Sequence, residues 1–153
     1  MRNKILYVGS MVFPDESAGA PTSFSLSKSF RDLGYEVTLL GLSKKTTDYM
    51  KLQKEQINGF TCYFHKCPET IGEWFEHTFS IKKIKEVINE LGEENVFAIV
   101  LMEYEAVPLI KISKYCKKRG IHVIADAEEW YGKSNLSFPK NLVKDFDTSL
   151  RMN

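Results

Sequence analysis

The N-terminal part of the chain constrains the fold more than any other part. An apolar run, Ile5 to Gly9, leads into a loop that contains Ala18-Gly19-Ala20, and a helical pattern then ends at Gly34. A second run, Glu36 to Gly41, closes the unit. This order predicts two parallel strands joined by a helix. The first turn runs into the N-terminus of that helix, so its backbone N–H groups would form a site for an anion, most often a phosphate.

The alternation of strands and helices continues along the chain. Apolar runs predict further strands at Gly59–His65, Phe97–Met102 and Ile121–Ala125. The last two runs are uninterrupted, which is typical of central strands covered on both faces. Apolar residues at helical spacing predict the connecting helices, namely Leu26, Phe30 and Leu33, then Ile81, Ile84, Ile88 and Leu91, then Leu109, Ile112 and Cys116. We therefore expect one α/β domain, residues 1–153, with a doubly wound, mostly parallel sheet in a three-layer α/β/α arrangement.

Other local features give more limited predictions. Residues Thr46 to Asn58 are polar and are expected to form a short helix or a loop, and Pro139 to Leu150 are expected to form a last helix. Ser80 is a candidate N-cap, and the candidate C-terminal caps are Gly34, Gly92 and Gly120. An aromatic cluster between a strand and a helix is expected from Trp74, Phe75 and Phe79.

Composition excludes several classes of protein. A net charge of +1 is too small for a dedicated nucleic-acid binder, and no apolar run is long enough to cross a membrane. The odd number of cysteines, Cys62, Cys67 and Cys116, favours buried or idle thiols in a reducing cytoplasm. The histidines His65, His77 and His122 lack the spacing of metal ligands. They are expected to be ordinary structural or surface residues, and no metal site is predicted.

Candidate binding residues follow from the geometry of parallel sheets, in which ligands bind beyond the carboxyl ends of the strands. The loop with Gly19 follows the first predicted strand. Acidic side chains follow two later strands, namely Glu103 and Glu105, then Asp126, Glu128 and Glu129. Crowded carboxylates disfavour one another's ionisation, so one of them could act as a general base or several could bind a hydroxylated ligand. Solvated strand ends and capping of the next segment are the alternatives.

The glycine loop fits no common nucleotide motif. It lacks the G-x-G-x-x-G spacing, and the chain contains no P-loop sequence. A loop that faces a phosphate or a sugar nucleotide, and a plain tight turn, both stay open. Lysines are concentrated in two predicted helices, namely Lys82, Lys83 and Lys85, then Lys111, Lys114, Lys117, Lys118 and Arg119. These lysines form either a solvated face or a surface with weak attraction to anionic lipid headgroups.

An ordered set of segments resembles a known family. Ile5-Leu-Tyr-Val-Gly9, Phe13-Pro14, Ala18-Gly19-Ala20, Leu33 to Leu40 and Val123 to Trp130 look like the N-terminal half of group 1, or family 4, glycosyltransferases. Those are retaining enzymes of the GT-B fold, with two Rossmann-like domains that face each other across a cleft. The resemblance spans nearly the whole chain in order and spacing.

The resemblance implies roles for several of the candidate residues. Gly19, with Ala18 and Ala20 beside it, would approach the donor diphosphate through backbone N–H groups. Asp126-Ala-Glu-Glu129 resembles a family pattern Asp-Ala-His-Glu, whose histidine lies near the reacting sugar. Glu128 stands at that position here, and with Asp126 it is the candidate catalytic residue. Glu103, Glu105 and Glu129 are candidate substrate-binding residues.

The implied function is the acceptor-binding half of a retaining hexosyltransferase. It would act on a nucleotide-sugar donor, with no other cofactor, and on a glycan, lipid or small acceptor, in bacterial cell-surface polysaccharide synthesis. We expect a cytoplasmic protein, with weak peripheral contact at the inner face of the membrane as the alternative to a fully solvated lysine surface. The donor-binding C-terminal domain is absent from these 153 residues, so this domain by itself is expected to be inactive. The alternatives are a flavodoxin-like or receiver-type interaction module and half of a sugar-nucleotide epimerase-like enzyme.

Overall fold

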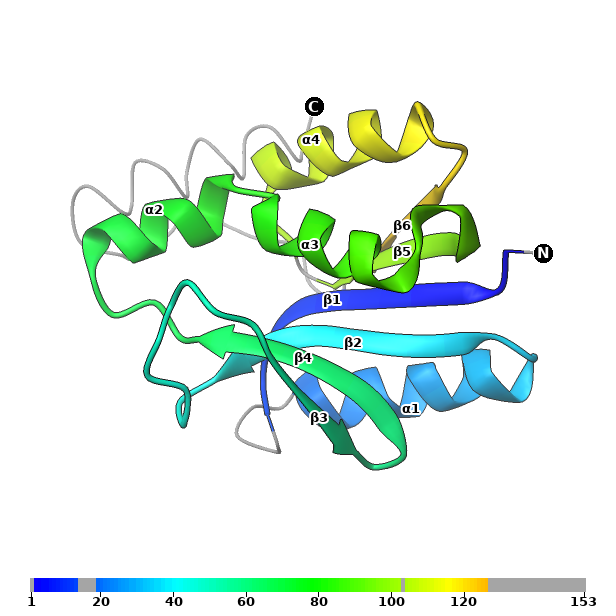
Figure 1. Cartoon of the computed structure of the whole chain (residues 1–153), viewed down its shortest axis with the longest axis horizontal. Helices are drawn as coiled ribbons and strands as arrows, with labels where there is room; N and C mark the ends of the chain where they lie inside the picture. Colours follow the sequence, from blue (N-terminus) through cyan, green and yellow to red (C-terminus); the bar gives the residue numbers. More distant parts are fainter. Residues whose placement is uncertain (1, 14–18, 103, 127–153) are drawn as a thin grey trace.

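A six-stranded sheet lies at the centre of the computed structural model, which describes residues 2–13, 19–102 and 104–126 (Figure 1). The strand order is β3-β4-β2-β1-β5-β6, and only β3 runs antiparallel to its neighbour. The strands are β1 (Lys4–Val12), β2 (Glu36–Ser43), β3 (Gln53–Ile57), β4 (Phe60–Lys66), β5 (Val96–Met102) and β6 (His122–Asp126). The predicted α/β class with a mostly parallel sheet is confirmed.

Helices cover both faces of the sheet, which makes the Rossmann-like three-layer arrangement (Figure 1). They are α1 (Gly19–Asp32), α2 (Ile71–Phe79), α3 (Lys82–Leu91), the short 3-10 helix η1 (Glu93–Asn95) and α4 (Ala106–Lys117). Successive side chains of a strand point to opposite faces, so β1 serves both layers. Its Tyr7 belongs to the core under α1, and its Leu6 belongs to the core under α3 and α4.

The segment from Thr46 to Asn58 contains a strand, so the prediction of a helix or a loop is wrong. Strand β3 pairs antiparallel with β4, and Ile57 faces Phe60 across a two-residue turn. The turn residues Asn58 and Gly59 have φ values of 52° and 78°. Positive φ at both central positions is the geometry that matches the twist of a hairpin, and Asn-Gly is its strongest sequence signal. That signal outweighs the polar character of β3, which suits an exposed sheet edge.

The aromatic cluster of Trp74, Phe75 and Phe79 lies on α2, a helix that was not predicted from the sequence. Phe75 stacks on Phe79 with ring centroids 5.9 Å apart, and Trp74 packs edge-on against Phe75 at 5.3 Å. Helix α2, which carries all three, begins at a capping box. The Thr70 hydroxyl accepts from the Glu73 N–H, and the Glu73 carboxylate accepts from the Thr70 N–H.

Two further predictions concern the sheet and the helix ends. Strand β5 lies between β1 and β6 and is buried, as predicted, whereas β6 forms the edge of the described sheet with Ile124 42% exposed. Within the residues of 2–126 that the structure describes, β6 pairs only with β5, so the prediction of a covered central strand is wrong for this part of the chain. A run of apolar residues does not show which strand lies outermost. The three predicted cap glycines all have positive φ. The prediction of Ser80 as N-cap is wrong by one residue, since Ile81 is the N-cap of α3 and Ser80 ends α2, although Ser80 Oγ still accepts from the Lys82 N–H. The predicted helix Pro139–Leu150 lies outside the described residues.

Candidate functional site

The carboxyl ends of the parallel strands meet where the chain changes direction across the sheet. From β1 the chain continues to β2 and β4 on one side, and it later crosses to β5 and β6 on the other side. Ligands of open α/β sheets bind at such a switch point, outside the strand ends. In this structure the switch point lies between β1 and β5, which pair from Lys4↔Val96 to Gly9↔Met102.

On one face of the sheet, the start of α1 packs against the end of β5. Gly19 and Ala20 occupy the first turn of α1, and Ala20 is buried. The Ser23 hydroxyl lies 3.2 Å from the Met102 sulfur. Met102 pairs with Asp126 of the next strand, so this strand end lies beside both the N-terminal turns of α1 and the end of β6.

Asp126 is held on the same face by a buried tyrosine. The Tyr7 hydroxyl donates to the Asp126 carboxylate at 2.7 Å. Tyr7 belongs to the core under α1 and has no exposed surface, so its ring fixes where the hydroxyl points. Glu105 stands at the N-cap of α4, the helix on the opposite face. The other predicted site residues, Ala18, Glu103, Glu128 and Glu129, lie outside the described residues.

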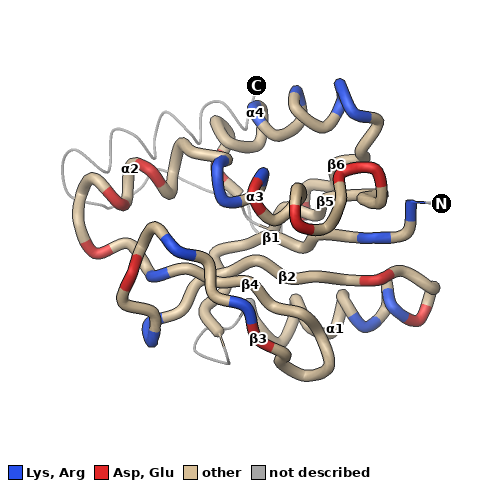
Figure 2. The backbone as a smooth tube through the Cα atoms, viewed as in Figure 1, with Lys and Arg blue, Asp and Glu red and all other residues tan. Residues whose placement is uncertain are grey.

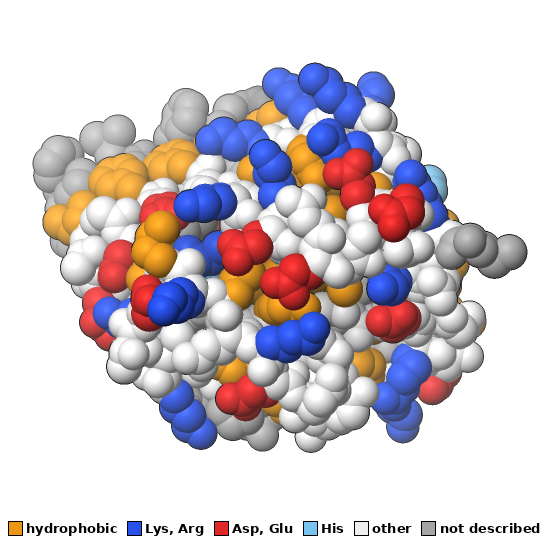
Figure 3. Space-filling model, in the orientation of Figure 1, with side chains coloured by type: hydrophobic (Ala, Val, Ile, Leu, Met, Phe, Trp, Pro, Cys, Tyr) orange, Lys and Arg blue, Asp and Glu red, His pale blue; other side chains and the backbone are white. Residues whose placement is uncertain are grey.

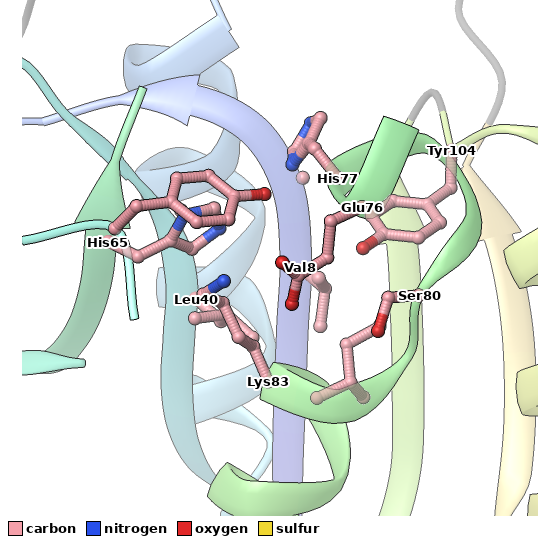
Figure 4. A pocket seen from close by; sticks show the side chains of 12 residues that line it. Val8, Leu40, His65, Glu76, His77, Ser80, Lys83 and Tyr104 are labelled. Atoms are coloured by element: carbon pink, nitrogen blue, oxygen red, sulfur yellow. The ribbon is translucent and has the colours of Figure 1, made fainter. Parts of the chain in front are cut away.

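On the opposite face, polar side chains from five parts of the chain line a small cavity. They are Tyr49 from the loop after β2, His65 from β4, Glu76 and His77 from α2, Lys83 from α3, and Tyr104 after β5. Figure 4 shows His65, Glu76, His77, Lys83 and Tyr104 directed toward a common space above Val8 and Leu40. We call this cavity the histidine pocket. Its volume is about 20 Å³, which is room for one water-sized group.

His65 is neutral and held in one tautomer. Its Nδ1 lies 3.0 Å from the Lys66 carbonyl oxygen, which can only accept, so Nδ1 carries the proton. Nε2 is left with a lone pair, and no described residue bonds to it. Burial, together with the positive charges of Lys83 and His77, lowers the pKa of His65 to about 3. The imidazole is therefore a hydrogen-bond acceptor on the pocket side at neutral pH.

Lys83 is packed against an anchored aromatic ring. Its ammonium lies 3.9 Å from the centroid of Tyr49, whose hydroxyl donates to the Glu73 carbonyl at 2.8 Å. Burial, reinforced by the charges of Glu76 and Glu73, raises the pKa of Tyr49 to about 12. Burial lowers the pKa of Lys83, and the nearby Glu76 opposes that shift. Burial also raises the pKa of Tyr104, so both phenols stay protonated at neutral pH.

The sequence did not predict that these residues would lie together. The histidines are scattered along the chain, yet the rings of His65 and His77 lie 5.7 Å apart. The sequence placed Lys83 on a solvated helix face, whereas Lys83 is half-buried in the pocket. The sequence did contain one indication that His65 belongs to a site, because His65 stands at the carboxyl end of a predicted strand, where ligands bind. The position of His77 depends on α2, which was not predicted.

The surface and the thiols give further observations. Within the part of the chain that the structure describes, no helix is long and apolar enough to cross a membrane, and no three potential metal-ligating side chains cluster. Cys62 and Cys116 are buried, as predicted. Lysines crowd the surface of α4 and the start of α3 (Figures 2 and 3). A groove of about 580 Å³ beside them is lined by Lys82, Lys85 and Lys111 as well as by Phe79 and Ile81.

No protein-family model, curated protein or solved structure matches the chain.

Proposed function

We propose that this chain is the acceptor-side domain of a retaining glycosyltransferase of the GT-B type. The observation that carries the proposal is the position of α1. Its first turn, with Gly19 and Ala20, adjoins the strand end that pairs with Asp126 at the switch point of the sheet. A nucleotide sugar brings both a diphosphate and a ring with hydroxyl groups to one place. Free N–H groups at a helix N-terminus suit the diphosphate, and a carboxylate suits the hydroxyls.

The proposed roles divide between backbone and side chains. Backbone N–H groups of Gly19 and its neighbours Ala18 and Ala20 would face the donor diphosphate. Asp126, with its carboxylate held by Tyr7, and Glu128 would face the reacting sugar. Glu103, Glu105 and Glu129 would contribute to substrate binding. A second domain would supply the sugar-nucleotide pocket, because charge that develops on the leaving diphosphate has to be stabilised from both sides of the cleft.

The first test is the reading frame beyond residue 153. We expect it to encode a second βαβ domain with two glutamates separated by seven residues. An immediate stop codon would contradict the transferase proposal and favour an interaction module.

The second test is turnover. The chain joined to that second domain should release nucleoside diphosphate from one member of a panel of nucleotide sugars. Gly19→Val should lower kcat/KM by at least about tenfold, because a branched side chain would block close backbone approach to the diphosphate. Asp126→Asn should also lower turnover, with Tm changing little. Equal kinetics for the wild type and Gly19→Val would remove the α1 turn from the site.

We also infer weak peripheral contact with anionic membranes from the basic surface of α3 and α4. Lys114, Lys117 and Lys118 are exposed there, and the half-exposed Ile110 lies on the same helix. Lysines near an anionic bilayer contribute about 1 kcal/mol each to binding, and an apolar side chain adds contact with the interface. Such contact would keep the protein close to a lipid-linked acceptor at the inner face of a bacterial membrane.

A further inference from the structure

The histidine pocket lies on the other face of the sheet from Asp126 and α1, so the proposed transfer reaction does not use it. Its Val8 and Ile84 belong to the core under α3, whereas Tyr7 and Ala20 belong to the core under α1. The pocket nevertheless opens at the same carboxyl edge, since Gly9 and Gly41 line it near the ends of β1 and β2. It is therefore a second polar site at one edge of the sheet.

Two hydrogen-bond acceptors, His65 Nε2 and the Glu76 carboxylate, face this pocket, and no hydrogen bond joins either of them to another described residue. His65 is 94% buried, from a relative exposure of 6%, and no described residue bonds to its Nε2. Glu76 directs its carboxylate toward the same space in Figure 4. Among the described residues, the buried side-chain atoms that lack a hydrogen-bond partner are Ser27 Oγ and Thr78 Oγ1, so the acceptor atoms of His65 and Glu76 stay accessible from the pocket. They suit a ligand that donates hydrogen bonds.

A donor faces them across the cavity. The Lys83 side chain is half-buried and lines the pocket together with Glu76 (Figure 4). Burial lowers the pKa of Lys83, and the negative charge of Glu76 opposes that shift. Even so, no ion pair joins Glu76 to Lys83 among the described residues. A group that sits between them would have to accept from Lys83 and donate to Glu76 or His65.

The charge and size of the pocket narrow the ligand class. Phosphate or carboxylate would meet the Glu76 carboxylate and the lone pair of His65, and a metal cation would meet the Lys83 ammonium. A hydroxyl both donates and accepts, and the volume of about 20 Å³ admits one group of that size. Ser10 and His77, whose Oγ and Nε2 lie 3.5 Å apart, place further polar atoms near the opening, which favours a ligand with several hydroxyls.

We propose that the histidine pocket binds one hydroxyl of a neutral sugar, with His65 Nε2 and the Glu76 carboxylate as acceptors and Lys83 as donor. The rest of the sugar lies over the opening at the carboxyl edge of the sheet. This proposal rests on the pocket alone and does not require that the chain belong to a transferase.

The test is an NMR titration of the 153-residue chain with ¹⁵N-labelled histidine, using a panel of methyl glycosides. The Nε2 resonance of His65 should shift on addition of at least one glycoside, while Nδ1 stays protonated. His65→Gln should weaken that binding about tenfold, as expected for loss of a buried hydrogen bond. The matched control is His122→Gln, because His122 is exposed on β6, and it should leave the affinity unchanged.

A second pair of variants keeps the proposal testable if His65→Gln does not fold. Lys83→Met should weaken glycoside binding about tenfold, whereas Lys82→Met, one residue earlier on the same helix and exposed, should not. The proposal is overturned if the His65 Nε2 resonance does not shift with any glycoside, even when each glycoside is added up to its solubility limit. It is also overturned if inorganic phosphate binds instead and protonates His65. If the chain binds glycosides but the joined protein shows no transferase activity, the proposed sugar binding in the histidine pocket is supported and only the proposed function is contradicted.

Discussion

The buried side chain of His65 makes the folded state harder to protonate and also offers a hydrogen-bond acceptor to the histidine pocket. A buried imidazole that must stay neutral resists protonation, and here the charges of Lys83 and His77 add to that resistance. The Lys66 carbonyl fixes the proton on Nδ1, so the acceptor atom has a defined position. An acceptor positioned in advance binds a donor with a smaller loss of side-chain entropy.

His65 should make the folded state sensitive to acid. Its pKa of about 3 lies below the value of 6.5 in the unfolded chain, so the unfolded state binds more protons between those values. The free energy of unfolding should therefore fall as pH drops from 6.5 toward 3, by up to about 1.4 kcal/mol per pH unit. Urea titrations across this range should show a steeper loss for the wild type than for His65→Gln. Equal slopes would mean that His65 is not buried and neutral.

Gly41 should be intolerant of any side chain because the end of β1 crosses over it. A Cβ atom there would lie 2.6 Å from the Met11 carbonyl oxygen and 2.6 Å from the ring of Phe13. Gly41→Ala should lower the free energy of unfolding by roughly 1 to 3 kcal/mol. Gly72→Ala is the matched control, because no heavy atom lies within 4 Å of that Cβ in α2. Chemical denaturation of both variants measures the difference, and an equal change in both would argue against the crossing.

At the scale of elements, the spacing of apolar residues predicted the strands and helices that are rich in such residues. It did not predict a polar strand and a short helix. Strand β5 and helix α3 carry uninterrupted or regularly spaced apolar residues, and both were predicted nearly to the residue. Strand β3 is polar because it lies at an edge, and α2 has only nine residues. Both missed elements begin or end at a local signal, Asn58-Gly59 for the hairpin and Thr70 with Glu73 for the helix. Turn and cap chemistry thus carried information that hydrophobic spacing did not.

The capping box should be important for α2 because the helix is short. Thr70→Ala removes the side-chain acceptor for the Glu73 N–H, and the expected loss is about 1 kcal/mol in the free energy of unfolding. Thr70→Ser keeps the acceptor and should stay within a few tenths of the wild type. Because α2 carries Glu76 and His77, Thr70→Ala should also weaken any glycoside binding in the histidine pocket. Thermal denaturation followed by circular dichroism tests the stability effect, and equal Tm values for the two variants would contradict it.

At the scale of the whole molecule, the sheet has two faces, and side chains that follow neighbouring strands can lie on either of them. Glu105 and Asp126 both follow parallel strands and therefore stand at the same carboxyl edge. In the structure Asp126 bonds to Tyr7 under α1, while Glu105 starts α4 on the opposite face. The end of a strand can be read from the sequence, but the face on which its last side chain lies depends on register. The rings of His65 and His77 likewise meet because α2 follows the carboxyl end of β4.

The distribution of charge over the whole molecule gives the last prediction. Basic residues concentrate on the α3 and α4 side, so that side should face an anionic bilayer and the α1 side should not (Figure 2). Cosedimentation with vesicles that contain anionic lipid should detect weak binding that declines as salt rises, because exposed charges are screened within about 10 Å. Lys114→Gln should reduce the partition coefficient about fivefold, which corresponds to about 1 kcal/mol. Lys28→Gln removes a charge that is also exposed, from α1, and should change nothing. If both variants lose binding equally, the attraction follows net charge rather than a face, and the inferred orientation toward the membrane is wrong.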